Sequence, residues 1–224
     1  MINVAIDGPA GAGKSSIARK VAGKLGYIYV DTGALYRTVA LKVAKLGLTA
    51  DRKDEIEKLL ESTTVGIEFV AGEQRMMLDG ADVTDSIRTP EVSMLASAVS
   101  AIPAVRAYLL NTQRRLAAEN NVIMDGRDIG TVVLPDAQIK IFLTASAEDR
   151  ATRRFDELKA KGMDVNYDDV LADIKTRDYN DSHRAVAPLK PADDSVFADT
   201  TGNEFEQSVA LIESIISEKL KEVK

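Results

Sequence analysis

Residues 2–15 read INVAIDGPAGAGKS, a short apolar run that leads directly into a glycine-rich turn. The run at 2–6 is mostly β-branched, which is typical of a strand buried in a parallel sheet. After the turn, apolar residues recur at helical spacing from Ile17 to Leu25, and Gly26 stands where a left-handed cap would end a helix. The stretch therefore predicts a strand, a loop and a helix in succession.

The turn matches the motif G-x-x-x-x-G-K-S/T at all four fixed positions. In such a loop the glycines let backbone N–H groups point at phosphate oxygens, the lysine reaches the terminal phosphates, and the hydroxyl can ligate Mg²⁺. The start of the following helix adds the positive end of its dipole. We therefore expect a nucleoside triphosphate to be bound by Gly8, Pro9, Ala10, Gly11, Ala12, Gly13, Lys14, Ser15 and Ser16.

Strand and helix patterns alternate along the rest of the chain. Short apolar runs at 27–30, 122–124 and 139–143 are typical of buried parallel strands, and 195–198 is a candidate last strand. Alternating apolar residues between 65 and 79 indicate a small antiparallel insert. Helices are expected at 54–62, from Pro90 with a break at Pro103, and at 147–161, 167–182 and 205–220. This alternation favours an α/β fold.

The composition limits the classes of protein that need to be considered. With 224 residues, 45% hydrophobic and 29% charged, we expect one globular body that carries an inserted lobe. The net charge of -6 argues against attraction to a nucleic-acid backbone, so any bound anion must be held locally.

The absence of cysteine excludes thiol catalysis and Cys-ligated metal centres. The N-terminus resembles no signal peptide, and no run approaches the ~18 apolar residues that a membrane span needs. We expect a cytoplasmic protein that binds neither membrane nor nucleic acid.

One phosphate loop does not distinguish a switch GTPase, an ATPase and a small-molecule kinase. The guanine motif N-K-x-D is absent, and a D-x-x-G match at Asp199–Gly202 lies too near the C-terminus to serve a GTPase. Guanidinium groups suit phosphate binding, and arginines are spread along the chain after the loop. They are Arg37, Arg88, Arg106, Arg127, Arg150, Arg153, Arg154, Arg177 and Arg184.

Four further strings resemble the bacterial cytidylate kinases, members of the nucleoside monophosphate kinase group. They are DTGALYR at 31–37, IRTPEV at 87–92, DGRDIGT at 125–131 and RAVAPL at 184–189. The resemblance implies a three-layer P-loop fold with a central parallel sheet, helices on both faces, an antiparallel insert in the monophosphate-binding region and a helical lid. It also implies a core of residues 1–53, 100–146 and 190–224, an insert at about 54–99 and a lid at about 147–189.

The same resemblance implies an acceptor site for CMP. Thr32, a serine in many relatives, would touch the pyrimidine, and Arg37 and Arg127 the acceptor phosphate. Arginine donors and a carboxylate acceptor suit the edge of cytosine, and a carboxylate suits ribose hydroxyls. The cytosine edge would be read by Arg106, Asp128 and Arg184, and the ribose held by Ser97, Arg177 and Asp181.

The catalytic groups implied are cations. Charge spreads over the oxygens of the transferred phosphoryl group, so cations placed there stabilise the transition state, and the acceptor phosphate is already an anionic nucleophile. Ser15 and Asp125, which follows the strand at 122–124, would hold Mg²⁺ directly or through water. The expected catalytic residues are Lys14, Arg127, Arg150 and Arg154, with Arg153 also in the lid.

We therefore expect a monomeric enzyme that transfers the γ-phosphoryl group of ATP to CMP or dCMP, giving ADP and CDP or dCDP, with Mg²⁺. Two alternatives stay open. Another P-loop kinase would use UMP, AMP or a non-nucleotide acceptor, against which the strings at 125–131 and 184–189 argue. A nucleotide-dependent switch would turn over no second substrate, and the surplus arginines disfavour it.

Overall fold

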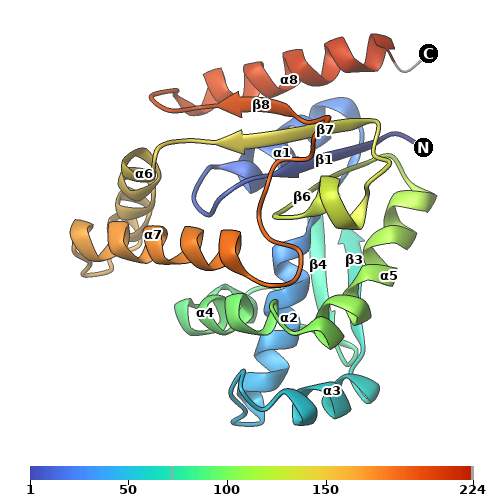
Figure 1. Ribbon diagram of the computed structural model, residues 1–224, viewed down its shortest axis with the longest axis vertical. Helices are drawn as coiled ribbons and strands as arrows, with labels where there is room; N and C mark the ends of the chain where they lie inside the picture. Colours follow the sequence, from blue (N-terminus) through green and yellow to red (C-terminus); the bar gives the residue numbers. More distant parts are fainter. Residues whose placement is uncertain (72, 223–224) are drawn as a thin grey trace.

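The computed structural model describes residues 1–71 and 73–222, with a parallel sheet at its centre (Figure 1). The strands lie in the order β2-β6-β1-β7-β8, and every neighbouring pair is parallel. Their bounds are Asn3–Asp7 for β1, Ile28–Asp31 for β2, Val122–Gly126 for β6, Ile139–Thr144 for β7 and Val196–Asp199 for β8. The expected strands are confirmed, each extending one or two residues further toward its polar end.

Helices cover both faces of this sheet, as expected. Helix α1 (Lys14–Leu25) and helix α8 (Phe205–Glu222) pack on the face that carries Val4 and Ile6. The other face, which carries Ala5, is covered by helix α5 (Pro103–Glu119) and a single π-helical turn η2 (Ile129–Val133). Neighbouring residues of β1 thus enter opposite cores, which is why the strand reads as a continuous apolar run.

A further hydrophobic core, separate from those on the two faces of the sheet, lies below the sheet in Figure 1. The antiparallel insert is confirmed as the sheet β3-β4-β5, with bounds Val65–Val70, Glu73–Leu78 and Ala81–Asp82. It packs with helices α2 (Thr32–Lys45), α3 (Lys53–Glu61) and α4 (Pro90–Val99), the start of α5 and a 3₁₀ turn η1 (Ser86–Arg88). Helix α2 therefore joins the end of β2 to the insert. The exact division of the chain at 53 and 99 stays a prediction.

Two helices project beside the sheet within the segment 147–189 where a lid is expected, and we call this pair the lid; its closing over a ligand stays a prediction. Helix α6 (Ala147–Ala160) and helix α7 (Tyr167–His183) pack on each other through Ala151, Val170 and Ile174. Figure 1 shows them beyond the end of β7, on the side of the sheet to which the strands point. The lid thus stands over the carboxyl ends of the strands.

Within the described ranges 1–71 and 73–222, no single helix is long and apolar enough to cross a membrane. Helices α4 and α5 pass that test only when they are taken together, and they are bent by 100° at the break between them.

The first glycine of the phosphate loop, defined as Gly8–Ser15, is fixed by its contact with β7. A Cβ on Gly8 would lie 1.9 Å from the carbonyl oxygen of Leu143, at a φ of 152° that side chains rarely adopt. We expect Gly8→Ala to destabilise the protein by about 3 kcal/mol and to lower Tm by roughly 6–12 °C. Thermal unfolding by calorimetry measures this.

The matched control is Gly23→Ala, in the last turn of α1, where an added Cβ would meet nothing within 4 Å. Alanine is the better helix former, so this variant should be stabilised by about 0.5–1 kcal/mol. Equal Tm values for the two variants would contradict the close approach of Gly8 to β7.

Candidate active site

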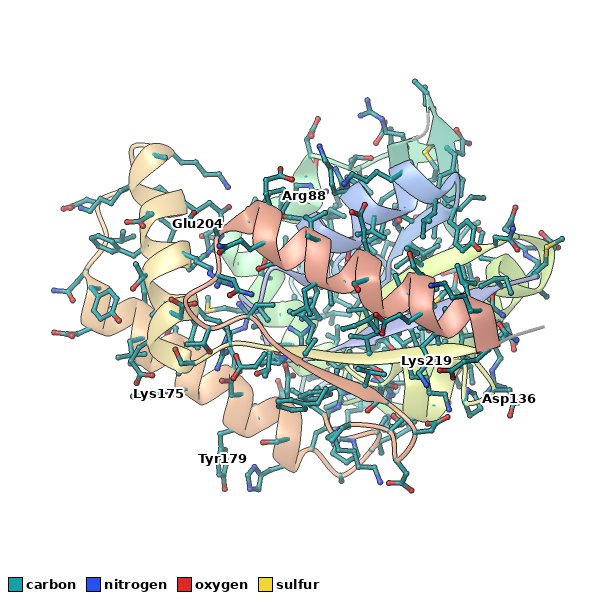
Figure 2. All side chains as sticks on the ribbon, turned by 90° about the horizontal axis from the view of Figure 1, so that it is seen from above. Arg88, Asp136, Lys175, Tyr179, Glu204 and Lys219 are labelled. Atoms are coloured by element: carbon teal, nitrogen blue, oxygen red, sulfur yellow. The ribbon has the colours of Figure 1, made fainter. Side chains whose placement is uncertain are left out.

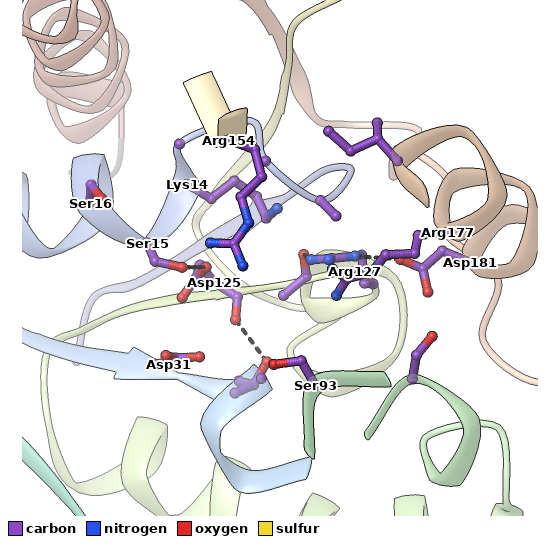
Figure 3. Close-up of a pocket in the computed structure, with 18 of the residues that line it drawn as sticks. Lys14, Ser15, Ser16, Asp31, Ser93, Asp125, Arg127, Arg154, Arg177 and Asp181 are labelled. Atoms are coloured by element: carbon purple, nitrogen blue, oxygen red, sulfur yellow. Dashed lines mark hydrogen bonds and ion pairs between the residues drawn. The ribbon is translucent and has the colours of Figure 1, made fainter. Parts of the chain in front are cut away.

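A cleft of about 700 Å³ opens at the carboxyl ends of the strands, between the phosphate loop, the lid and helix α4 (Figure 3). Its lining includes Ala10, Gly11, Gly13, Lys14, Ser15 and Ser16 of the loop. All the residues expected at the acceptor site also line it: Thr32, Arg37, Ser97, Arg106, Arg127, Asp128, Arg177, Asp181 and Arg184. The structure therefore brings all the expected acceptor residues and six of the nine expected donor residues together in one space, whereas Gly8, Pro9 and Ala12 do not line it.

The phosphate loop ends at a helix whose first amides are available for an anion. Gly11 and Gly13 have φ values of 76° and 81°, which L side chains rarely adopt, and Gly13 is the N-cap of α1. None of the described side chains caps α1 at this end. Free N–H groups and the helix dipole at this point attract a phosphate.

Lys14 lies buried beneath the loop, and its Nζ donates to the carbonyl oxygen of Pro9 at 2.7 Å. Burial, together with the positive charge of Arg127, lowers the pKa of Lys14, while the charge of Asp125 opposes that shift. A phosphate entering the loop would supply the negative charge that this ammonium group lacks.

Asp125 is the centre of a hydrogen-bond network at the end of β6. Its carboxylate accepts from Ser15 Oγ at 2.9 Å and from Tyr29 OH at 2.8 Å, and its main-chain oxygen accepts from Thr32 Oγ1 at 2.7 Å. Burial, with the nearby charge of Asp31, raises the pKa of Asp125. The contact of Ser15 with Asp125 is drawn in Figure 3.

These groups fit the magnesium ion expected here. A hydroxyl and a carboxylate are oxygen donors, and Mg²⁺ is commonly held by one or two protein oxygens together with water and substrate phosphates. No cluster of three or more His, Cys, Asp or Glu that could form a complete protein cage was found in the described ranges. Ser15 and Asp125 thus match a metal that is shared with a nucleotide.

The three residues expected to read cytosine form one cluster at the cleft. Arg106 and Arg184 both pair with Asp128, and the Arg184 Nη2 lies 3.0 Å from its Oδ1. Burial raises the pKa of Asp128, and the two guanidinium groups oppose that shift. The Arg106 guanidinium also lies over the ring of Tyr36, 5.6 Å from its centroid. Tyr36 lines the cleft as well, a role that the sequence analysis missed.

The two arginines expected at the acceptor phosphate, Arg37 and Arg127, are each paired with a carboxylate. Arg127 Nε donates to Asp181 at 2.7 Å (Figure 3), and Arg37 Nη2 lies 2.9 Å from Asp31. Burial, with the charge of Arg127, lowers the pKa of Arg177. Several cations therefore meet in a space where an anionic ligand would relieve their repulsion.

The lid arginines do not share one environment. Arg154 extends into the cleft near Ser15 and Asp125, as Figure 3 shows, and pairs with Glu157 at 2.8 Å, while Arg153 also lines the cleft. Arg150, expected among the catalytic residues, is instead buried and bonded away from the cleft. Arg150 lies in the first turn of α6, on the side that packs against α7 and the phosphate loop. The spacing of Arg150, Arg153 and Arg154 in the sequence did not show which of them would line the cleft.

Asp7, which the sequence analysis gave no role, anchors the loop that carries Arg127 and Asp128. Its two carboxylate oxygens accept from the backbone N–H groups of Ile129 and Gly130, each at 2.7 Å. Burial raises the pKa of Asp7 from 3.8 to about 6, although these two hydrogen bonds oppose the shift. The sequence feature that could have identified Asp7 is its position as a carboxylate at the end of a buried strand.

The raised pKa gives Asp7 a pH-dependent effect on stability. The folded state holds the proton of Asp7 more tightly than the unfolded state. Stability is therefore lost as the pH rises from the unfolded-state pKa of 3.8 to the folded-state pKa of about 6. At about 1.36 kcal/mol per pKa unit, the free energy of unfolding of the wild type relative to Asp7→Asn should fall by about 3 kcal/mol from about pH 3 to about pH 7. Urea unfolding across this range measures it, and a constant difference would contradict the raised pKa.

Comparison with known proteins gives whole-length matches. A family model described as cytidylate kinase matches residues 4–218. A cytidylate kinase of Caldicellulosiruptor saccharolyticus is 54% identical over 206 residues, covering 92% of this chain and 91% of that protein. One of Carboxydothermus hydrogenoformans is 49% identical over 220 residues, covering 97% and 98%. Among solved structures, an uncharacterised protein from Eubacterium ventriosum has a TM-score of 0.54 at 13% identity, covering 97% and 99%, which reflects the fold alone.

Proposed function

This chain belongs to the cytidylate kinase family, and from that premise we propose that it transfers the γ-phosphoryl group of ATP to CMP or dCMP. The products are ADP and CDP or dCDP. The observation that supports this most is that one cleft contains both the phosphate loop and the cluster of Arg106, Asp128 and Arg184. The first suits a nucleoside triphosphate, and the second suits a base with both acceptor and donor groups on its edge.

The acceptor nucleotide would lie between helices α4 and α7. The carboxylate of Asp128 accepts a hydrogen bond from the exocyclic amine of cytosine, while arginine N–H groups donate to its ring nitrogen and carbonyl oxygen. Asp181 and Ser97 are suited to the ribose hydroxyls. Arg37 and Arg127 then meet the monophosphate, which displaces part of their contact with Asp31 and Asp181.

The transfer itself is carried by positioning and positive charge. Lys14 and the amides at the start of α1 bind the donor phosphates, and Arg127 orients the acceptor oxygen in line with the γ-phosphorus. Arg154 reaches the charge that develops on the transferred oxygens. The acceptor is a phosphate anion, so no side chain is required to remove a proton from it.

Magnesium is the cofactor we propose, held by Ser15 and Asp125 directly or through water. When bound, it would neutralise charge on the donor phosphates. Tyr29 holds the second carboxylate oxygen of Asp125 and so fixes its orientation. Monomeric state, cytoplasmic location and independence of nucleic acid and membranes stay predictions.

The test is ADP release from Mg-ATP with CMP, dCMP, UMP, AMP or no acceptor in parallel. Release that depends on CMP or dCMP, with UMP and AMP slow, is the expected result. A preference for AMP or UMP would retain a P-loop kinase but contradict the base-reading cluster. Equal release in every lane, including the one without acceptor, would favour a nucleotide-dependent switch.

A further inference from the structure

Arg150 lies in helix α6 of the lid, and all three nitrogens of its guanidinium group donate hydrogen bonds within the protein. Its side chain is 5% exposed, and its Nε donates to the carbonyl oxygen of Ala145 at 2.9 Å. Its Nη1 donates to the carbonyl oxygen of Ala10, in the phosphate loop, at 2.9 Å. The same guanidinium binds both carboxylate oxygens of Asp178, at 3.0 and 2.6 Å. One side chain thus connects the start of α6, the phosphate loop and helix α7.

The phosphate loop also packs against this junction through its backbone. A Cβ on Gly11 would lie 3.3 Å from the Cβ of Arg150 and 3.8 Å from Cδ1 of Ile174, so the loop rests on α6 and α7 with little free space. The contact between the phosphate loop and the lid helices is therefore fixed both by the hydrogen bond from Arg150 to Ala10 and by close packing at Gly11. Planar bidentate pairing of a guanidinium with a carboxylate adds a fixed orientation to it.

Helix α7 carries the acceptor-site side chains on both sides of Asp178. Arg177 precedes it and lines the cleft, and Asp181, one turn later, binds Arg127. Neither Arg150 nor Asp178 is among the residues that line the cleft. The position of Asp178 relative to Ala10 thus sets how far the acceptor-binding face of α7 stands from the donor loop.

We propose that Arg150 and Asp178 are a positioning pair that locks α7 against the phosphate loop and thereby couples acceptor binding to donor binding. The inference rests on the proposed kinase function. With the pair intact, a nucleotide that orders the loop also orders α7, so the acceptor meets a site already in place. An alignment error of about 1 Å is enough to cost an enzyme on the order of 10²-fold in rate.

The experiment uses the full chain with Asp178→Asn and, separately, Arg150→Lys. Steady-state kinetics give KM for CMP and for ATP, and calorimetry gives the affinity for CMP with and without a non-hydrolysable ATP analogue. We expect about a tenfold rise in KM for CMP, less than about a threefold change in KM for ATP, and a loss of most of the gain in CMP affinity that the analogue produces.

Glu148→Gln is the matched control. Glu148 and Lys175 form an exposed pair, at 3.2 Å, that joins the same two helices without touching the phosphate loop. Figure 2 shows Lys175 pointing outward from α7. This control should keep both KM values and the coupling, since exposed pairs contribute little.

The outcomes separate this inference from the proposed function. A wild-type chain without CMP-dependent turnover would overturn the function, whereas an active wild type without coupling between the two nucleotides would overturn the pairing. An Asp178→Asn variant that matches Glu148→Gln, or that only loses Tm with an unchanged KM ratio, would also overturn it. If Asp178→Asn does not fold, Asp178→Glu takes its place: partial retention of coupling supports the pair, and full retention of the KM values and coupling contradicts it.

Discussion

Replacement of Lys14 by methionine is expected to lower kcat about 10³-fold while the protein stays folded. Lys14 is the buried cation of the phosphate loop, and we propose that in the kinase reaction it stabilises the charge spread over the oxygens of the transferred phosphoryl group. Removing one preorganised donor from such a site costs on the order of 10²–10³ in rate, and removing a full charge reaches the upper end. Methionine keeps much of the length of the lysine stem, so the measured loss reports the ammonium group.

The measurement is ADP release at saturating ATP and CMP, with Tm recorded for each variant. Because burial already lowers the pKa of Lys14, deleting its charge removes a desolvated cation and should leave Tm unchanged or higher. Lys219→Met is the control, since Lys219 lies on α8 and pairs only with Glu222 among the described residues. Equal kcat for Lys14→Met and the wild type would place the donor phosphates elsewhere.

Much of the fold was predictable because its central strands are short and mostly apolar. The run at 122–124 reads as a buried strand, and β6 is buried along its whole length. The prolines at 90 and 103 begin α4 and α5, since proline fits the first turn of a helix. The π-helical turn after Asp128 was not predicted, because it depends on the contact of Ile129 and Gly130 with Asp7, 122 and 123 residues away in the chain.

The candidate site was predictable where a motif fixes both residue type and spacing. The phosphate loop and the strings around Asp125 and Arg184 contain the residues that meet in the cleft. Side-chain direction on a helix was not predictable in the same way. Arg150, Arg153 and Arg154 share one short charged segment, yet only Arg150 is bonded to Asp178 and withdrawn from the cleft. Which face of α6 meets α7 is decided by tertiary packing.

Replacement of Asp128 by asparagine is expected to lower kcat/KM for CMP about 10³-fold. Asp128 is 4% exposed and holds Arg106 and Arg184, which are themselves buried at the cleft. Asparagine keeps the shape but carries one acceptor oxygen and an NH₂ group, so the cytosine amine and two arginines compete for a single oxygen. Buried polar groups left without partners cost the most at such a site, which is why polar recognition discriminates strongly.

A general collapse of the pocket would have the same effect on CMP, so a second acceptor is needed to interpret the result. The asparagine NH₂ can donate to the carbonyl that uracil has in place of the cytosine amine, so the ratio of kcat/KM for CMP to that for UMP should fall at least about tenfold. Asp136→Asn, at an exposed site labelled in Figure 2, should leave that ratio unchanged. An Asp128→Asn variant that loses CMP and UMP turnover equally would mean that Asp128 only supports Arg106 and Arg184, and that the arginines alone select the base.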